Sequence, residues 1–196
     1  MSDEELDLSA PELTPEDVLT IDDPYFHADT VAVVTGAASG IGRATAVALA
    51  ANGLTVVGAD IDEDGLAETE EMVEDFDLDG RFVGSLTDLT DDDDVEAVVA
   101  AAAEEGDLRF VANIAGMQHI ASIPEFPMEK YDLLLDVMLR APFLVSKHAM
   151  GHVRATHDGI GAIGNMCSVH GHYATQDKAA YITAKHGLRG LTRSIA

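Results

Sequence analysis

Residues 30–60 read TVAVVTGAASGIGRATAVALAANGLTVVGAD, and this stretch decides the fold. Its first six residues are mostly apolar and β-branched, as in a buried strand. The glycine-rich run GAASGIG (36–42) follows at once, and the next residues have the spacing of a helix that stops at Gly53. A second strand pattern, LTVVGAD, then ends at Asp60. The stretch therefore predicts a strand, a glycine-rich turn, a helix and a second strand.

The glycine-rich turn points to a dinucleotide. Glycines let the backbone approach a pyrophosphate closely, and the new helix offers it free N–H groups and a positive dipole end. Asp60 lies 18 residues after Gly42, where a carboxylate accepts both ribose hydroxyls and repels a 2′-phosphate. This spacing predicts NAD rather than NADP. A tight turn without a ligand is the weaker interpretation, because the spacing agrees at both ends.

The alternation of strands and helices continues along the chain. We expect helices over 61–76, 91–105 and roughly 128–157, the last interrupted near Pro142, and strands over 81–86, 108–114 and 160–166. Elements of these lengths imply an α/β domain, a doubly wound parallel sheet with helices on both faces. Ligands of such sheets lie across the carboxyl ends of the strands.

A second group of polar residues follows the last predicted strand. Ser168 comes just after that strand, and Tyr181 and Lys185 stand four residues apart in an Ala-rich helical run. Positions i and i+4 share one face of a helix, and a nearby cation favours the phenolate of a tyrosine. Ser, Tyr and Lys together could transfer a proton to a carbonyl or from a secondary alcohol. Taken singly, each is as well explained by a helix surface or a cap.

Composition excludes several functions. The chain has 196 residues, enough for one domain, and 36 acidic against 11 basic residues give a net charge of −25. This charge argues against nucleic acid binding, and we interpret it as adaptation to a high-salt cytoplasm. No run is long and apolar enough to span a bilayer, and no signal-peptide pattern begins the chain. The single Cys167 fits a reducing compartment.

Outside these patterns the sequence carries little chemistry. Residues 1–29 hold ten acidic residues and no Lys or Arg, which predicts a mobile or loosely docked arm. Three of the eight histidines, His148, His152 and His157, lie along one helical stretch, and solvated or interface side chains explain them best. We find no metal-ligand spacing.

The motifs taken together identify the chain as a member of the short-chain dehydrogenase/reductase family, with the resemblance running from about residue 30 to the end. They are TGAASGIG, Asp60, Asp88-Leu89-Thr90, Asn113-Ile114-Ala115-Gly116, and Ser168 with Tyr181-x-x-x-Lys185. The resemblance implies a Rossmann-type domain, a nicotinamide cofactor and a homotetramer. It also implies that the following residues bind NAD: Gly36, Ser39, Gly40, Ile41, Gly42, Asp60, Asp88, Leu89, Asn113, Tyr181 and Lys185.

The resemblance also implies individual roles in catalysis. Tyr181 would be the general acid/base, Lys185 would lower its pKa, and Ser168 would orient the substrate oxygen. GMQHIASIPEFPMEKYD (116–132) and DKAAYITAKHGLRGLT (177–192) resemble the branch that interconverts 3-hydroxybutyrate and acetoacetate. That resemblance makes Gln118, His170 and Lys178, beside Ser168, a clamp on the substrate carboxylate. Alone, His170 is equally a turn residue and Lys178 a solvated lysine.

Two departures from the family pattern affect the prediction. Met138 stands where the family usually has an Asn that helps a water-mediated proton relay, and Met cannot perform that role. Ile114 replaces a second Asn, which alters local hydrogen bonding. The chain also ends at Ala196 within a helical pattern, so the C-terminal part of the family fold is absent, whether by truncation or because this is a fragment.

Three functions agree with these observations. The leading hypothesis is an NAD-dependent dehydrogenase for a short 3-hydroxy acid. The alternatives are a dehydrogenase for another small alcohol or sugar, and a dinucleotide-binding protein that does not catalyse. Its partners would be a small-molecule substrate and further copies of the chain, with no nucleic acid and no membrane.

The net charge generates a first prediction. Self-repulsion at −25 should destabilise the compact state at low ionic strength, and salt screens that repulsion. The melting temperature should therefore rise from dilute buffer into the molar range of NaCl, as thermal unfolding would show. A flat or falling melting temperature would refute the interpretation as salt adaptation.

Overall fold

Five parallel strands form one sheet in the order β3-β2-β1-β4-β5. The computed structural model describes residues 14–156 and 158–196. The strands are β1 (Thr30–Thr35), β2 (Thr55–Asp60), β3 (Arg81–Leu86), β4 (Asp107–Asn113) and β5 (Ala162–Asn165). Every residue of the central β1 is buried, whereas the edge strand β3 alternates buried and exposed positions. The predicted doubly wound Rossmann-type sheet is confirmed.

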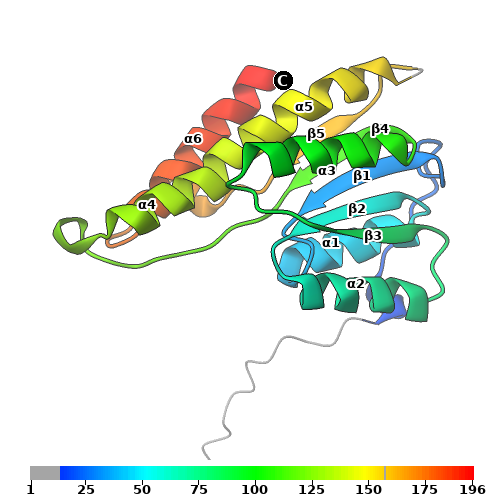
Figure 1. Cartoon of the computed structure of the whole chain (residues 1–196), viewed down its shortest axis with the longest axis horizontal. Helices are drawn as coiled ribbons and strands as arrows, with labels where there is room; N and C mark the ends of the chain where they lie inside the picture. The colour runs from blue at the N-terminus through cyan, green and yellow to red at the C-terminus, as the bar shows by residue number, and fades with distance from the viewer. Residues whose placement is uncertain (1–13, 157) are drawn as a thin grey trace, which may run out of the picture.

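Helices cover both faces of the sheet (Figure 1). On one face α1 (Gly40–Ala51) and α2 (Glu63–Asp75) pack on β1, β2 and β3, and on the other α3 (Asp92–Glu104) and α5 (Ala141–Ala155) pack on β1 and β4. The remaining long helices are α4 (Met128–Leu135) and α6 (Ala179–Ile195). Short helical turns are η1 (Pro15–Asp17), η2 (Ile123–Glu125) and η4 (Val169–Gly171).

Acidic residues begin the helices on both faces. Asp62 precedes α2 and its Oδ1 accepts the N–H of Gly65, and Asp91 precedes α3 and accepts the N–H groups of Asp93 and Asp94. These caps satisfy orphan donors, and the carboxylates suit the positive end of the helix dipole. Because capping residues lie outside the helix proper, α3 begins one residue later than its pattern predicts.

The long helical region before β5 is interrupted by a π-helical turn, η3 (Asp136–Arg140), and not at Pro142 itself. The N–H of Ala141 donates to the carbonyl of Asp136, five residues back. Pro142 then lies in the first turn of α5, where its missing N–H costs least. The wide turn accommodates the missing donor, and π turns of this kind are frequent at functional sites.

The segment before β1 contacts the domain. Asn52, just after α1, accepts the N–H of Ile21 and donates to the carbonyl of Leu19. The rings of Phe26 and Phe110 meet edge to face at 5.9 Å between centroids. Of the arm predicted over 1–29, residues 1–13 lie outside the described part of the chain, as does His157.

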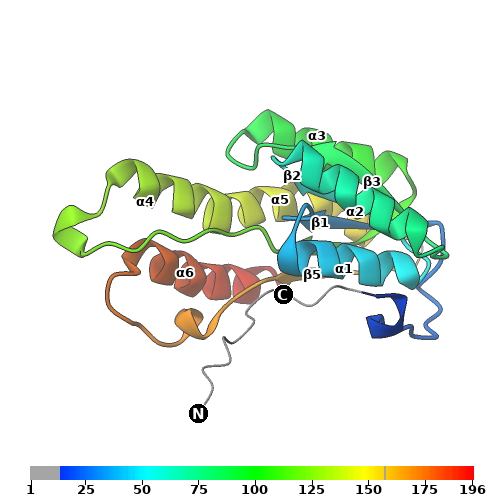
Figure 2. The ribbon, with the colours of Figure 1, turned by 90° about the horizontal axis from the view of Figure 1, so that it is seen from below.

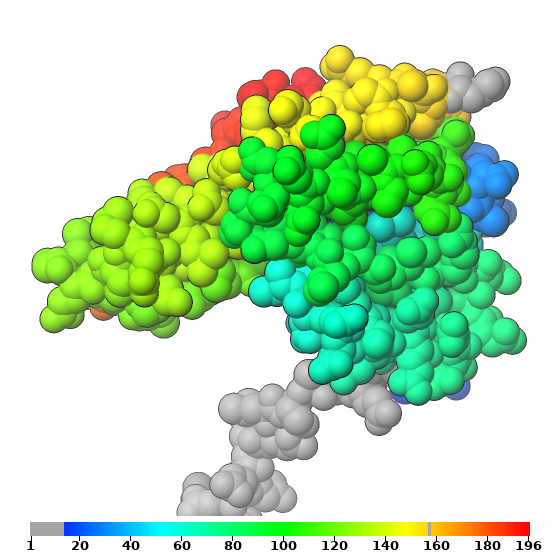
Figure 3. Space-filling view, in the orientation of Figure 1, coloured from blue at the N-terminus to red at the C-terminus, as the bar shows by residue number. Residues whose placement is uncertain are grey.

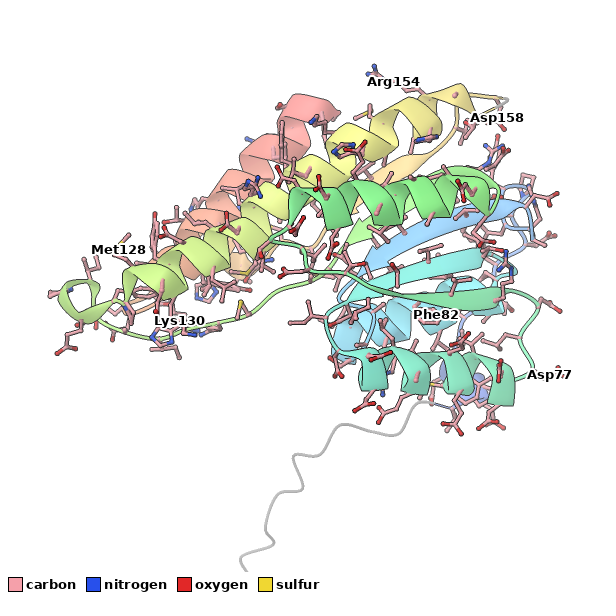
Figure 4. All side chains as sticks on the ribbon, in the orientation of Figure 1. Asp77, Phe82, Met128, Lys130, Arg154 and Asp158 are labelled. Carbon is pink, nitrogen blue, oxygen red and sulfur yellow. The ribbon has the colours of Figure 1, made fainter. Side chains whose placement is uncertain are left out.

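Helix α4 and the loop that leads to it extend away from the sheet (Figures 1 and 2). The space-filling view shows this extension as a lobe beyond the body of the domain (Figure 3). Met128 and Lys130 lie on it (Figure 4). A small core of Leu134, Met138, Ala180 and Ala184 joins the lobe to α6. Within residues 14–156 and 158–196, no helix has the length and apolar character needed to cross a membrane.

One buried cation holds β4 to the loop before β5. The guanidinium of Arg109 is 4% exposed, and it bonds Asp158 at 2.6 Å and the carbonyl of Ile160 at 3.0 Å. Tyr25 stacks against it, with its ring centroid 5.5 Å from the guanidinium carbon. The hydrogen bond from Arg109 lowers the pKa of the Asp158 carboxyl. The Arg109–Asp158 ion pair therefore stabilises the loop before β5, and this contribution is lost when Asp158 is protonated.

This shift predicts a pH-dependent effect of Asp158→Asn. Since the folded-state pKa of Asp158 lies below its unfolded-state value, its contribution to stability is present at neutral pH and is lost as the pH falls through the folded-state pKa. The variant should melt below the parent at pH 7, and the gap should close at strongly acid pH, below the folded-state pKa of Asp158. Thermal melts at both pH values test this, with the exposed Asp132→Asn as control. A gap that does not change with pH would contradict the assignment.

Candidate active site

The glycines of the loop between β1 and α1 serve three different purposes. Gly36 has a φ of +74°, and a Cβ there would lie 2.9 Å from the Cα of Ala115. A Cβ on Gly42 would lie 1.8 Å from the carbonyl oxygen of Gly36, so only glycine lets the helix start so close to the strand. Gly40, by contrast, has a φ of +53° and open space where a Cβ would point. The loop is thus tightly packed at Gly36 and Gly42 and open at Gly40.

The open side of this loop exposes backbone N–H groups at the start of α1. Ser39 is the N-cap of α1, and Gly40 and Ile41 begin the helix, so their N–H groups have no acceptor within it. Ser39 and Ile41 are exposed. An exposed helix start beside a residue-free space attracts phosphate through its N–H groups and dipole. The predicted cofactor residues 36–42 thus come together.

Asp60 ends β2 beside the same loop. Its Oδ2 accepts the N–H of Ala38 at 3.1 Å, and its Oδ1 accepts the N–H of Asp62 at 3.1 Å. These bonds fix the carboxylate and leave each oxygen a further lone pair for a ligand hydroxyl. Asp88 and Leu89 follow β3, next to β2 in the sheet, with Asp88 exposed and Leu89 buried.

Arg43 has no role in the sequence-based prediction, yet it braces the loop. Its side chain donates to Thr69 at 3.0 Å, to Glu68 at 2.7 Å, and to the carbonyls of Ala38 and Gly65. The Arg43 guanidinium thus makes its hydrogen bonds to these four protein acceptors. Only the fold could reveal this, since Glu68 and Thr69 come from the following helix.

Asn113 ends β4 on the other side of β1. It is 3% exposed, and its Nδ2 donates to the Oδ1 of Asn165 at 2.9 Å. Within the described residues its own Oδ1 has no hydrogen-bond partner. A buried carbonyl without a partner is costly, so this oxygen is a natural acceptor for a ligand hydroxyl. Asn165 in turn donates to Thr192 on α6, and sequence patterns single out neither residue.

The predicted catalytic residues come together where β5 leads into α6. Lys185 is 3% exposed, and its Nζ donates to the carbonyl of Met166 at 2.6 Å and lies 5.6 Å from the centroid of the Tyr181 ring. Ser168 precedes η4, and its Oγ accepts the N–H of His170 at 3.2 Å. The His170 ring meets Tyr181 edge to face at 5.7 Å. Ser168, Tyr181 and Lys185 thus lie near one another where the chain passes from β5 into α6.

Burial changes the pKa of Lys185. Removal from water lowers the pKa of the Lys185 ammonium, and the nearby Cys167 acts in the opposite direction. A cation held out of water acts more strongly on a neighbouring phenol than a solvated one. The arrangement is suited to proton transfer through Tyr181.

The three residues expected to bind a carboxylate come from two loops. Gln118 follows β4 and Lys178 precedes α6, and these loops are joined by a bond of 3.0 Å from the N–H of Ala121 to the carbonyl of Asp177. His170 lies beside Ser168. Among the described residues no hydrogen bond joins the side chains of Gln118, His170 and Lys178. The structure joins the two loops, and the binding of a carboxylate by Gln118, His170 and Lys178 stays a prediction.

Met138 lies fully buried within the π turn. Its sulfur is 3.6 Å from the position that a Cβ on Gly116 would take, so it packs against the loop after β4. A thioether offers only a weak acceptor, and its contacts here are apolar. The residues described contain no group of three or more His, Cys, Asp or Glu side chains arranged for a metal.

A doubly wound sheet with a glycine-rich loop, a carboxylate at the end of β2 and a Ser/Tyr/Lys group at one edge defines a Rossmann-type domain with a candidate active site. The family profile described as short chain dehydrogenase matches residues 30–196. The chain belongs to the short-chain dehydrogenase family.

Relatives and solved structures agree with this. The chain is 39% identical over 171 residues to cis-4-hydroxycyclohexanecarboxylate dehydrogenase of Sinomonas cyclohexanicum, covering 86% of this chain and 67% of the relative. It is 33% identical over 172 residues to D-beta-hydroxybutyrate dehydrogenase of Rhizobium meliloti, covering 84% and 64%. Carveol dehydrogenase of Mycobacterium avium, solved in complex with NAD, superposes with a TM-score of 0.79 at 30% identity, covering 86% and 65%. The chain spans about two thirds of the length of these proteins.

Proposed function

We propose that this protein is an NAD-dependent dehydrogenase that interconverts a short 3-hydroxy acid and its 3-keto acid, with 3-hydroxybutyrate and acetoacetate as the leading pair. The observation that carries the proposal is the buried Lys185 ammonium held 5.6 Å from the centroid of the Tyr181 ring. Two of the relatives are named for hydroxy carboxylates, which supports a substrate of that class.

The residues present fit a nicotinamide dinucleotide. The open helix start at Gly40 suits its pyrophosphate, and the partnerless oxygen of Asn113 suits a ribose hydroxyl. When bound, the nicotinamide ring supplies the carbon that accepts or gives a hydride. Asp88 and Leu89 would lie beside the adenine.

Charge favours NAD over NADP. The Asp60 carboxylate would accept ribose hydroxyls but would repel a 2′-phosphate. Arg43 is the nearest cation in sequence, and its bonds to Glu68, Thr69 and two carbonyls leave it poorly placed to offset that repulsion. A 2′-phosphate would therefore be disfavoured by an anion that lacks a compensating cation.

Proton transfer would centre on Tyr181. In ketone reduction its hydroxyl would give a proton to the substrate oxygen, and Lys185 would stabilise the phenolate left behind. Ser168 would hold the same oxygen through a hydrogen bond. Since Met138 offers no group for a relay at its position, Tyr181 and Lys185 would have to exchange protons by another route.

The region around the proposed substrate is less acidic than the rest of the chain. Residues 126–196 contain eight Lys or Arg against five Asp or Glu, whereas residues 30–125 contain three against 21. An anionic substrate would thus approach from the less repulsive half. Lys178 would bind its carboxylate through a charge-assisted bond, with Gln118 as a further donor.

The second candidate is a dinucleotide-binding protein that does not catalyse, and buried Met138 is the observation that favours it. A third possibility within the family is a dehydrogenase for another small alcohol. NADH titration together with a turnover assay separates the first two, because only the dehydrogenase both binds and turns over.

The proposed assembly is a homotetramer in a high-salt cytoplasm. Helices α5 and α6 contain no Asp or Glu, in a chain with 36 of them. Beside them, Leu135 of α4 and Leu139 of η3 line a hollow with Phe143 and Leu191, and Asp136 and Arg140 lie at the same hollow. Phe143 is 52% exposed, and a largely apolar surface of this kind is suited to contact between copies.

The cofactor assignment predicts a change of preference in Asp60→Ala. The unmodified protein should bind NADH far more tightly than NADPH. The variant should narrow that gap by roughly 10-fold or more, because charge-assisted hydrogen bonds and charge repulsion disappear together. Fluorescence titration measures both affinities. Equal affinity of the unmodified protein for the two cofactors would contradict the NAD assignment.

The mechanism predicts that Tyr181→Phe lowers kcat by roughly 10²–10⁴-fold while NADH still binds. The substitution removes the transferable proton and leaves the ring that packs on His170. Steady-state rates and NADH titration give the two readouts, and the remote Tyr25→Phe serves as control. A variant that retains its rate would remove Tyr181 from the mechanism.

The substrate class predicts that Lys178→Ala discriminates between ketones. Loss of a charge-assisted bond should raise KM for acetoacetate by roughly 10–150-fold, with little effect on an uncharged ketone of similar size. Exposed Lys147→Ala is the matched control. If KM rises equally for both ketones, the hydroxy-acid proposal fails and the broader dehydrogenase proposal survives.

A further inference from the structure

The His170 ring lies between two hydroxyl groups. Its Nδ1 is 3.4 Å from the Oγ of Ser168, and its Nε2 is 3.1 Å from the Oγ1 of Thr175. The ring is half-buried, and the edge-to-face contact with Tyr181 at 5.7 Å restricts its rotation. Both ring nitrogens therefore have a hydroxyl partner.

The state of this ring decides what Ser168 can do. A neutral imidazole has one N–H donor and one acceptor nitrogen. If Nδ1 is the acceptor, it takes the Ser168 hydrogen and turns it away from a substrate. If Nδ1 carries the hydrogen, it donates to the Ser168 Oγ, which already accepts the backbone N–H of His170 at 3.2 Å. Both lone pairs of that oxygen are then occupied, and its hydrogen is left for the substrate.

The contact with Thr175 is compatible with both states, and donation by its hydroxyl would favour one of them. A hydroxyl both donates and accepts, so Thr175 can give its hydrogen to Nε2 and leave the ring hydrogen on Nδ1. The tautomer of a histidine is set by the hydrogen bond that its other nitrogen makes. Thr175 lies in the exposed loop between η4 and α6 and has no part in the site as predicted from the sequence.

We propose that His170 is a positioning residue that directs the Ser168 hydroxyl hydrogen towards the substrate oxygen, and that Thr175 holds His170 in the Nδ1–H tautomer. The inference rests on the proposed role of Ser168. It gives His170 an effect on every substrate, charged or not, in place of contact with a carboxylate, because both ring nitrogens are then occupied.

The charge of the ring gives the proposal a distinctive pH dependence. When His170 is protonated both nitrogens are donors, so Nδ1 donates to Ser168 whether or not Thr175 is present. A defect caused by loss of the Thr175 hydroxyl should therefore disappear at acid pH. The other titratable or charged groups on η4, α6 and the adjoining loops are Cys167, His172, Tyr173, Asp177, Lys178, Tyr181, Lys185, His186, Arg189 and Arg193. They are common to parent and variant, so their titration cancels in the ratio of rates.

The first test measures the tautomer directly in the 196-residue chain. Long-range ¹H–¹⁵N correlation spectra distinguish Nδ1–H from Nε2–H, and the signals lost in His170→Gln assign the residue. We expect Nδ1–H in the parent, Nε2–H in Thr175→Val, and recovery of Nδ1–H in Thr175→Ser. Thr183→Val, an exposed position on α6, is the control and should leave the spectrum unchanged. An Nε2–H tautomer in the parent, or no change in Thr175→Val, would overturn the proposal.

The second test measures rates of ketone reduction. Thr175→Val should lower kcat by roughly 3- to 10-fold on acetoacetate and on an uncharged ketone alike, with little change in KM, since one neutral hydrogen bond is misdirected. The ratio to the parent should return to one at acid pH. A selective loss on acetoacetate, or a loss that persists at acid pH, would overturn the proposal. If the tautomers behave as expected but Ser168→Ala keeps full activity, it is the proposed role of Ser168 that fails.

Discussion

The parallel pairing of β1 with β2 on one side and β4 on the other is the constraint on which the site depends. Because all three strands point the same way, the residues that follow them meet at one edge of the sheet. The glycine-rich loop, Asp60 and Asn113 are separated by up to 77 positions in the chain, yet all three end or follow these strands. The close approach of Gly42 to Gly36 then sets where α1 begins and leaves its first N–H groups open. The proposed cofactor recognition thus depends on backbone geometry more than on side chains.

The proposed catalytic residues Tyr181 and Lys185 are held in place by a different interaction. The Lys185 ammonium reaches the carbonyl of Met166 at the end of β5, so one hydrogen bond links α6 to the sheet. Asn165 strengthens that link by joining Asn113 on β4 to Thr192 on α6. A shift of α6 would therefore disturb Tyr181, Lys185 and the Asn113 oxygen together. This coupling places the proposed cofactor and proton-transfer groups on one rigid assembly.

Acidity affects the two halves of the molecule differently. Most carboxylates lie on the elements from β2 to β4, where many cap helices or lie exposed in their first turns. Helices α5 and α6 have none; α6 carries Tyr181 and Lys185, and Phe143 of α5 and Leu191 of α6 line part of the hollow. Acidic residues are thus concentrated away from the helices that carry the proposed proton-transfer residues. This division is consistent with both the proposed anionic substrate and the proposed assembly.

The sequence by itself determined the order and type of the main elements and the strand ends that carry Asp60 and Asn113. Local patterns suffice there, because glycine requirements, helix caps and strand periodicity are properties of neighbouring residues. The tertiary structure alone decided the rest. Arg43 bonds Glu68 and Thr69, the interruption expected near Pro142 takes the form of a π-helical turn at 136–140, and His170 lies between Ser168 and Thr175. Each of these depends on which groups satisfy hydrogen bonds in the folded chain, and residue spacing does not record which partners a donor finds.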